Sequence, residues 1–186
     1  GVHRQGAGLA DGGGLWVVQA GQMVLATGAL ERPLLFERND LPGVMLADAV
    51  LHYLQRNGVL CGARPVIATN NDSAYPVALA LAEAGAAVTM VDSRPPSVRS
   101  AAAEERGIRV LTGARIAKAL GRRRVSGVVL ADGTRIACDL VAVSGGWTPT
   151  LHLYCQAGGK AVWDQDRAIL VPAFPVPGIS LTGRVA

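Results

Sequence analysis

The residue types and spacing that best suggest chemistry lie in residues 69–75, TNNDSAY, and in the acid Asp92. A β-branched apolar run precedes this segment, and an Ala- and Leu-rich stretch follows it and ends at Gly85. In a strand–turn–helix unit of this kind, glycines let backbone N–H groups approach a phosphate at the start of the helix. Residues 69–75 contain no glycine. Their position is therefore that of a phosphate-binding turn, but their composition is not.

The elements around this turn form a βαβ unit. Residues 64–68 and 87–92 are predicted strands, and residues 73–84 are a predicted helix that Gly85 can end. Such a unit predicts a Rossmann-like parallel sheet. Asp92 then stands at the end of the second strand.

When the turn is aligned on Gly85 and Asp92, the three glycine positions of a dinucleotide-binding fingerprint hold Thr69, Asn71 and Ala74. Asn tolerates positive φ and Ala is accepted at the third position, so the turn is expected to form. Close approach of a pyrophosphate to the backbone is harder to support, because Thr69 and Asn71 stand at positions where glycines allow it. Two interpretations stay open: a nucleotide site, and a βαβ unit kept for structure.

Two acids bear on this choice. Asp72 stands beside the predicted helix start, where its carboxylate can cap free amides and take the place of an anion. Asp92 stands where an acid hydrogen-bonds a ribose 2′-OH and repels a 2′-phosphate, which favours NAD over NADP. Capping the turn or helix that starts near Ser93 is an equal alternative for Asp92. If the unit binds a nucleotide, the candidate contacts are Thr69, Asn70, Asn71 and Asp92.

Composition restricts the class of protein. The 186 residues are 50% hydrophobic and 17% charged, which suits one or two small domains. No apolar run reaches the roughly 18 residues of a membrane span and the start lacks a signal-peptide pattern, so a cytoplasmic protein without membrane contact is expected. The separated Cys61, Cys138 and Cys155 indicate buried structural thiols and no Cys-x-x-Cys pair.

The net charge of +4 includes one dense arginine cluster, residues 122–124. It lies between two apolar-leaning runs that read as hairpin strands, with Gly121 at the turn. Because no aromatic residues interleave with the arginines, we expect a solvated turn and no nucleic-acid partner.

No catalytic residue or metal site is predicted. None of the three histidines has a Ser, Cys or carboxylate at the spacing of a triad, and no Glu-x-x-His or Asp-x-Asp pattern occurs. Redox chemistry would then belong to a cofactor that the protein binds and orients.

The remaining segments indicate how the βαβ unit is mounted. Together they predict an α/β fold with a parallel sheet and an antiparallel hairpin region. The predicted elements are strands at residues 15–20, 22–28, 108–111, 139–144 and 179–182, a helix at residues 46–55, and antiparallel strands within residues 114–137.

Two distant segments carry a resemblance to two-dinucleotide-domain flavoprotein reductases. Residues 24–33, VLATGALERP, resemble the second signature of that superfamily, and residues 176–183, VPGISLTG, resemble its closing signature. Four blocks resemble the alpha subunits of heterotetrameric sarcosine oxidases more specifically. They are residues 39–47, 69–75, 138–147 and 156–160. Subunits of opine oxidases and hydrogen cyanide synthase share this architecture.

The resemblance implies a domain plan. Residues 1–59 and 145–186 would be part of an outer FAD/NAD-type dinucleotide-binding domain, and residues 60–144 an inserted second one. Family members carry a Gly-x-Gly-x-x-Gly loop upstream and a large folate-handling region downstream, so this chain is expected to be an internal fragment.

The resemblance also implies cofactor contacts in the outer domain. The backbone of Ala26, Thr27 and Gly28 would run beside the first nucleotide, and Gly183 is the last residue of the closing signature. In FAD-binding members an Asp follows this Gly, whereas Arg184 follows it here, so the FAD-specific contact is absent. Arg184 alone reads as a frayed, solvated end. NAD is thus the cofactor implied for the outer domain, with FAD or FMN in a beta subunit or at the interface with it.

By the same resemblance, the chain supports flavin-dependent oxidative demethylation of sarcosine to glycine, with hydrogen peroxide and a one-carbon unit. The amine oxidation belongs to the beta subunit, and the isolated fragment is expected to be inactive. Two alternatives stay open: an NAD(P)H-dependent flavoprotein reductase, and a non-catalytic scaffold subunit of an amine or opine oxidase or hydrogen cyanide synthase complex.

Overall fold

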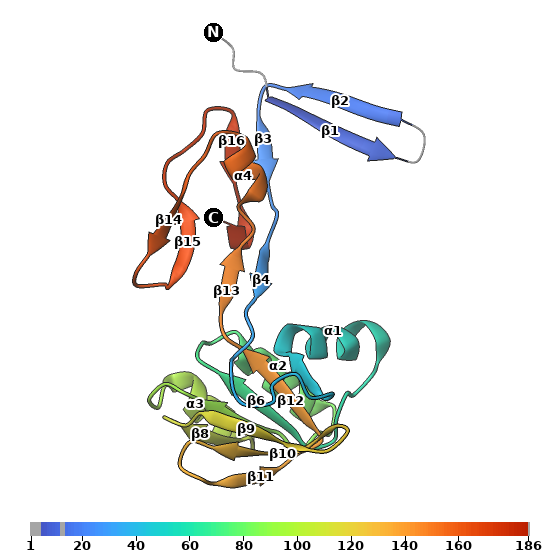
Figure 1. Cartoon of the computed structure of the whole chain (residues 1–186), viewed down its shortest axis with the longest axis vertical. Helices are drawn as coiled ribbons and strands as arrows, with labels where there is room; N and C mark the ends of the chain where they lie inside the picture. The colour runs from blue at the N-terminus through green and yellow to red at the C-terminus, as the bar shows by residue number, and fades with distance from the viewer. Residues whose placement is uncertain (1–4, 12–13, 186) are drawn as a thin grey trace. The chain divides into compact units, whose positions relative to one another are not determined.

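The computed structural model describes residues 5–11 and 14–185, with side chains from residue 17 onward. It divides the chain into two compact units, one made of Gly1–Leu30 and Trp147–Ala186 and the other of Glu31–Gly146. We call the first the outer unit and the second the inserted unit, because the second interrupts the first in the sequence. Figure 1 shows the elements of each, coloured along the chain.

The inserted unit is built on a five-stranded sheet in which every pair of neighbours is parallel. Its strands, in spatial order, are β5 (Val44–Leu46), β12 (Leu140–Ser144), β6 (Pro65–Thr69), β7 (Thr89–Asp92) and β8 (Arg109–Thr112). Helix α2 (Ala74–Glu83) connects β6 to β7. The predicted βαβ unit and the predicted α/β fold are therefore confirmed.

Side-chain alternation along the strands makes two cores. Ile67, Met90 and Leu140 belong to a buried cluster with residues of α1 (Ala47–Asn57), α2 and α3 (Val98–Glu105). Val66 and Val141 belong to a second cluster with residues of an antiparallel sheet. That sheet contains β9 (Ile116–Gly121), β10 (Val125–Leu130) and β11 (Arg135–Ala137), with β10 in the middle. The parallel sheet is thus covered on both faces, which explains why β6 and β12 are buried at every residue.

The first boundary between the units lies near residue 30, whereas the sequence places it near residue 60. The reason is β5, whose Val44 pairs with Val141 of β12 and so extends the parallel sheet at its edge. Helix α1 follows at once and buries Ala47 and Val50 in the helix-side core. A three-residue strand is too short to leave a periodic signal, so the sequence did not indicate this attachment.

The described helices are short. The longest, α1, has 11 residues and ends at Gly58, whose φ of 63° is left-handed and whose N–H donates to the Leu54 carbonyl. Among the residues that the structure describes, no helix is long and apolar enough to cross a membrane.

In the part of the outer unit that the structure describes, short two-stranded sheets are combined with one short α-helix. Its central feature is a parallel pair, β3 (Met23–Leu25) and β16 (Ile179–Leu181), in which Leu25 faces Leu181. The buried core contains Leu25, Leu151, Tyr154, Val176 and Val185. The other elements are β1 (Gln5–Asp11), β2 (Gly14–Ala20), β4 (Ala29–Glu31, which ends at the boundary), β13 (Trp147–Pro149), α4 (His152–Gln156), β14 (Ala161–Asp164), β15 (Ile169–Pro172) and the 3₁₀ turn η1 (Gly183–Val185).

Candidate functional site

The glycine-free turn is held by its own side chains. The Thr69 hydroxyl accepts a hydrogen bond from the Asn71 N–H at 3.1 Å and donates one to the Asn71 carbonyl at 2.9 Å. The Asn71 side chain donates to the Ser144 carbonyl at 3.0 Å, and its amide oxygen accepts from the Ser73 N–H at 3.0 Å. Asn71 therefore joins the end of β12 to the start of α2.

The backbone conformation of Asn71 differs from the positive φ that the sequence allowed. Among the described residues other than glycine, only Arg38 and Ala168 have positive φ, so Asn71 does not use its left-handed tolerance. The turn closes through side-chain hydrogen bonds instead. Two backbone N–H groups that a phosphate would need, those of Asn71 and Ser73, already have protein acceptors.

Asp92 is buried and fully hydrogen-bonded. One carboxylate oxygen accepts from the Arg94 N–H at 3.0 Å and its Nε at 3.1 Å, and the other accepts from the Tyr75 hydroxyl and an Arg94 terminal nitrogen, both at 2.8 Å. Burial acts to raise the pKa of Asp92, but the hydrogen bonds from Arg94 and Tyr75 outweigh it and hold the pKa below its ordinary value. Asp92 thus caps the turn after β7, one of its two predicted roles.

The partners of Asp92 extend this network. Burial, together with the hydrogen bond to Asp92, raises the pKa of Tyr75 to about 12, so the phenol remains a donor. Arg94 also forms an ion pair with Asp72 at 2.8 Å, and Asp72 lies 3.4 Å from Arg99. The expectation that Asp72 caps the amides of α2 is wrong, because no side-chain cap occurs at that helix start and both Asp72 oxygens face arginines.

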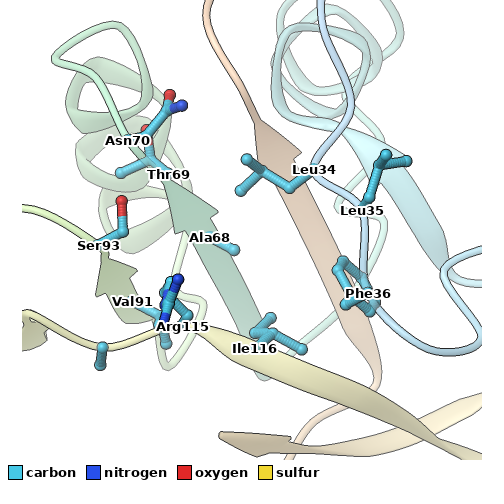
Figure 2. Close-up of a pocket in the computed structure, with 11 residues that line it drawn as sticks. Leu34, Leu35, Phe36, Ala68, Thr69, Asn70, Val91, Ser93, Arg115 and Ile116 are labelled. Atoms are coloured by element: carbon cyan, nitrogen blue, oxygen red, sulfur yellow. The ribbon is translucent and has the colours of Figure 1, made fainter. Parts of the chain in front are cut away.

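A pocket of about 240 Å³ opens at the carboxyl ends of β6 and β7. Figure 2 shows Thr69, Asn70 and Ser93 at these strand ends and Leu34 and Phe36 across from them. The lining residues are Leu34, Leu35, Phe36, Ala68, Thr69, Asn70, Val91, Ser93, Ala114, Arg115 and Ile116. In an open α/β sheet, ligands bind at this edge.

Two of the four predicted contacts in the inserted unit line this pocket. Thr69 and Asn70 do, whereas Asn71 and Asp92 are engaged in the neighbouring networks. The sequence missed the contributions of segments 34–36 and 114–116. Residues 114–116 directly follow β8, so the rule that ligands gather at strand ends could have identified them once the strand order was known.

In the outer unit, the predicted strand end is shaped by backbone contacts. The Thr27 hydroxyl donates to the Thr150 carbonyl at 2.7 Å, and the Thr150 N–H donates to the Gly28 carbonyl at 3.0 Å. The Thr182 N–H donates to the Leu25 carbonyl at 3.0 Å. The β3–β16 pair therefore brings residues 26–28 beside Gly183.

Both Gly28 and Gly183 have a left-handed backbone conformation and free space where a side chain would begin. Gly28 and Gly183 have φ of 69° and 72°, and no heavy atom lies within 4 Å of the point where a Cβ would stand. Arg184, expected as a frayed end, is exposed but lies 3.9 Å from the centre of the Trp147 ring. The neighbouring Val185 is completely buried, which anchors this segment.

The cysteines are only partly as predicted. Cys138 is buried, Cys61 is half-buried and Cys155 is exposed. Burial raises the pKa of Cys138 to about 11, which leaves its thiol protonated and unreactive at neutral pH.

The parallel sheet with a strand-end pocket, inserted between two segments of a second unit, defines the class of two-domain, Rossmann-like dinucleotide folds. The chain belongs to the pyridine nucleotide-disulphide oxidoreductase family, which matches residues 9–186. Proteins of this family bind FAD- or NAD(P)-type cofactors, so membership implies a dinucleotide-binding fold.

The resemblance to sarcosine oxidase alpha subunits is also confirmed. The chain is 42% identical over 184 residues to sarcosine oxidase subunit alpha of Corynebacterium sp. (strain P-1), covering 92% of this chain and 19% of that protein. It therefore spans about a fifth of the length of this curated relative.

Solved structures show the same fold. A ferredoxin reductase from Rhodopseudomonas palustris superimposes with a TM-score of 0.66 at 26% identity, covering 90% of this chain and 45% of that one. Thioredoxin reductase from T. acidophilum has a TM-score of 0.68 at 20% identity, covering 91% of this chain and 59% of that one.

Proposed function

We propose that the chain is the nucleotide-binding part of a sarcosine-oxidase-like alpha subunit. The observation that carries this proposal is the identity of 42% over 92% of the chain to a subunit of that name. The complete enzyme would convert sarcosine, with oxygen and water, to glycine, hydrogen peroxide and a one-carbon product. The alpha subunit would act with a flavin-binding beta subunit, where the amine oxidation itself takes place.

The outer unit is the proposed site of NAD. Its backbone suits a bound nucleotide, because Gly28 and Gly183 follow the paired strands β3 and β16 and a Cβ at either glycine would meet no atom within 4 Å. Ala26 and Thr27 would contact the cofactor through their backbone, since the Thr27 hydroxyl is already bonded to Thr150. FAD or FMN, in the beta subunit or at its interface with this chain, would supply the oxidation when bound.

A pair of glycine variants tests the NAD site. Gly28→Ala and Gly158→Ala both place a Cβ on a residue with positive φ, at 69° and 94°, with no atom within 4 Å. They therefore cost similar backbone strain, about 1–2 kcal/mol each. In the full-length subunit purified with its beta partner, we expect Gly28→Ala to lower the NAD released by acid extraction at least fivefold, and Gly158→Ala to leave it unchanged. Equal NAD contents in both variants would contradict the assignment.

The reaction is tested on the same complex. Wild-type enzyme should form hydrogen peroxide and glycine in equal amounts from sarcosine and oxygen. Absence of sarcosine turnover in an assembled, flavin-containing complex would refute the sarcosine assignment, and turnover of another secondary amine would favour an opine-oxidase-type relative.

One observation favours a second candidate, a scaffold role for the inserted unit. The side chains that would meet a dinucleotide there, Asn71 and Asp92, are bonded within the protein. A self-contained disulfide reductase is opposed by the lack of a Cys-x-x-Cys pair and by the protonated, buried Cys138. A scaffold role for the inserted unit predicts assembly with the beta subunit and no nucleotide bound to the inserted unit, whatever the outer unit binds.

A further inference from the structure

Polar groups are paired within the protein around Asp92, but several at the adjacent strand-end pocket have no partner among the described residues. Around Asp92, both carboxylate oxygens have donors and Arg94 is shared between two acids. At the pocket, none of the described residues pairs with the side-chain NH₂ of Asn70, the hydroxyl of Ser93 or the guanidinium of Arg115. The Asn70 amide oxygen does accept a bond from Asn71 at 3.0 Å, which leaves its NH₂ as the available group.

These three available groups are all able to donate. Arg115 is the one charged residue among the described residues that line the pocket, and no carboxylate lines it. Asp92, which lies between the lining residues Val91 and Ser93 in sequence, has its charge matched by Arg94. The polar end of the pocket therefore favours an anion.

The rest of the lining is apolar. Ala68 and Val91 come from the sheet, Ile116 from the start of β9, and Leu34 and Phe36 from the segment opposite (Figure 2). The volume of about 240 Å³ is below the roughly 300–1,000 Å³ of pockets that enclose drug-sized ligands. The cavity thus suits a small apolar body and is too small to enclose a dinucleotide.

We propose that the inserted unit binds, in this pocket, a small ligand with an apolar body and one anionic group, and that it does not bind a dinucleotide. The anion meets Arg115, with Ser93 and Asn70 as further donors. A dinucleotide is rejected because Asp92 is satisfied by Tyr75 and Arg94 and because the turn amides are bonded to Thr69 and Asn71. This inference is independent of NAD in the outer unit.

The anionic group can be a phosphate on a nucleoside or a carboxylate on an aromatic ring, and two matched pairs of probes separate these sources. AMP is compared with adenosine, and benzoate with benzamide, by titration into the ¹⁵N-labelled 186-residue chain. We expect at least one anion to shift the backbone amide resonances of Ser93 and Arg115 with saturation, and its neutral mate to bind at least threefold more weakly. NAD should leave the amides of Asn71 and Asp92 unshifted, whereas NAD in the outer unit would shift Gly28 and Gly183.

Two arginine variants provide the control. Arg115→Gln should weaken binding of the anion at least threefold and leave the neutral mate unchanged. Arg109→Gln removes an exposed arginine from the opposite end of β8 and should leave both unchanged. Both variants should keep the dispersed amide spectrum of the folded chain, since both side chains are exposed.

Three results would overturn the proposal. The first is that neither anion shifts Ser93 and Arg115, and the second is that Arg109→Gln weakens the anion as much as Arg115→Gln. The third is that NAD shifts Asn71 and Asp92 with saturation, which would restore the dinucleotide interpretation of the inserted unit. Failure of the NAD site in the outer unit, by contrast, would change only the Gly28 and Gly183 shifts.

Discussion

At the scale of single residues, Asp92 shows that an acid at the position of a ribose contact can serve another role. The acid stands at the strand end where a ribose contact is expected, and the sequence correctly places it there. The sequence does not show that Arg94, two residues later, donates hydrogen bonds to the same carboxylate from its backbone and its side chain. The acid at this position was predictable. Its hydrogen-bond partners were not, because they depend on a turn geometry that the periodicity of the sequence does not encode.

Substitution of this acid should be costly and dependent on pH. Asp92→Asn removes the charge that faces the partly exposed Arg94 and should lower the free energy of unfolding by about 2–3 kcal/mol at pH 7. Because the folded pKa of Asp92 is lowered, its contribution is present above the unfolded pKa of about 3.9 and is lost as pH falls through the folded pKa. Urea unfolding followed by circular dichroism should therefore show a difference between wild type and variant that shrinks below about pH 4.

Asp40→Asn serves as the matched control, since Asp40 is an exposed acid of the same unit. It should change the free energy of unfolding by less than about 0.5 kcal/mol. A difference between wild type and Asp92→Asn that stays constant from pH 7 to pH 3 would contradict the role of the charge.

At the scale of elements, the strands of the parallel sheet that follow β5 in sequence and the helix between β6 and β7 were predictable because their apolar runs leave a clear pattern. Strands β6, β7, β8 and β12 and helix α2 lie where the sequence places them. Two features were not predictable: the three-residue strand β5, and the residues after β8 that line the pocket. Both acquire their role only from the order of strands in the sheet. The site was thus half predictable: Thr69 and Asn70 from the turn, but Arg115 and Phe36 only from the assembled fold.

The two hairpins of the antiparallel sheet offer a test of local geometry. A Cβ at Gly121, the last residue of β9, would collide with the Arg124 carbonyl oxygen, whereas a Cβ at Gly133, between β10 and β11, would meet no atom within 4 Å. Both residues have positive φ, at 140° and 86°. Thermal or urea unfolding should show Gly121→Ala to be destabilising by about 2–5 kcal/mol and Gly133→Ala by about 1–2 kcal/mol. Equal losses would mean that the β9–β10 turn relaxes freely around the added methyl group.

At the scale of the whole molecule, the two units have separate cores of unequal size. The inserted unit encloses its parallel sheet between two buried clusters, whereas the described side chains of the outer unit form one cluster with five buried residues. Stability varies across a structure with the density of buried apolar contacts. We therefore expect the amides of β6 and β12 to exchange with solvent more slowly than those of β3 and β16 in hydrogen-exchange mass spectrometry.

Core truncation in each unit should separate the two unfolding events. Leu25→Ala in the outer unit and Leu81→Ala in the inserted unit each remove a buried side chain, 5% and 0% exposed, and should each cost about 2–5 kcal/mol. In differential scanning calorimetry, Leu25→Ala should lower the first transition and Leu81→Ala the second. A single transition that both variants lower alike would show that the units unfold together.

The ends of the inserted unit are tied to each other. The Arg32 N–H donates to the Gly146 carbonyl at 2.8 Å, and the Gly145 N–H donates to the Arg32 carbonyl at 2.7 Å. A module whose entry and exit strands are already paired closes itself, and such modules are tolerated as insertions because the host chain need only bridge a short gap. Substitutions inside such a module, including any in residues 69–75, leave the junctions with the host chain unchanged. The glycine-free composition of residues 69–75 therefore does not affect how the inserted unit is joined to the rest of the chain.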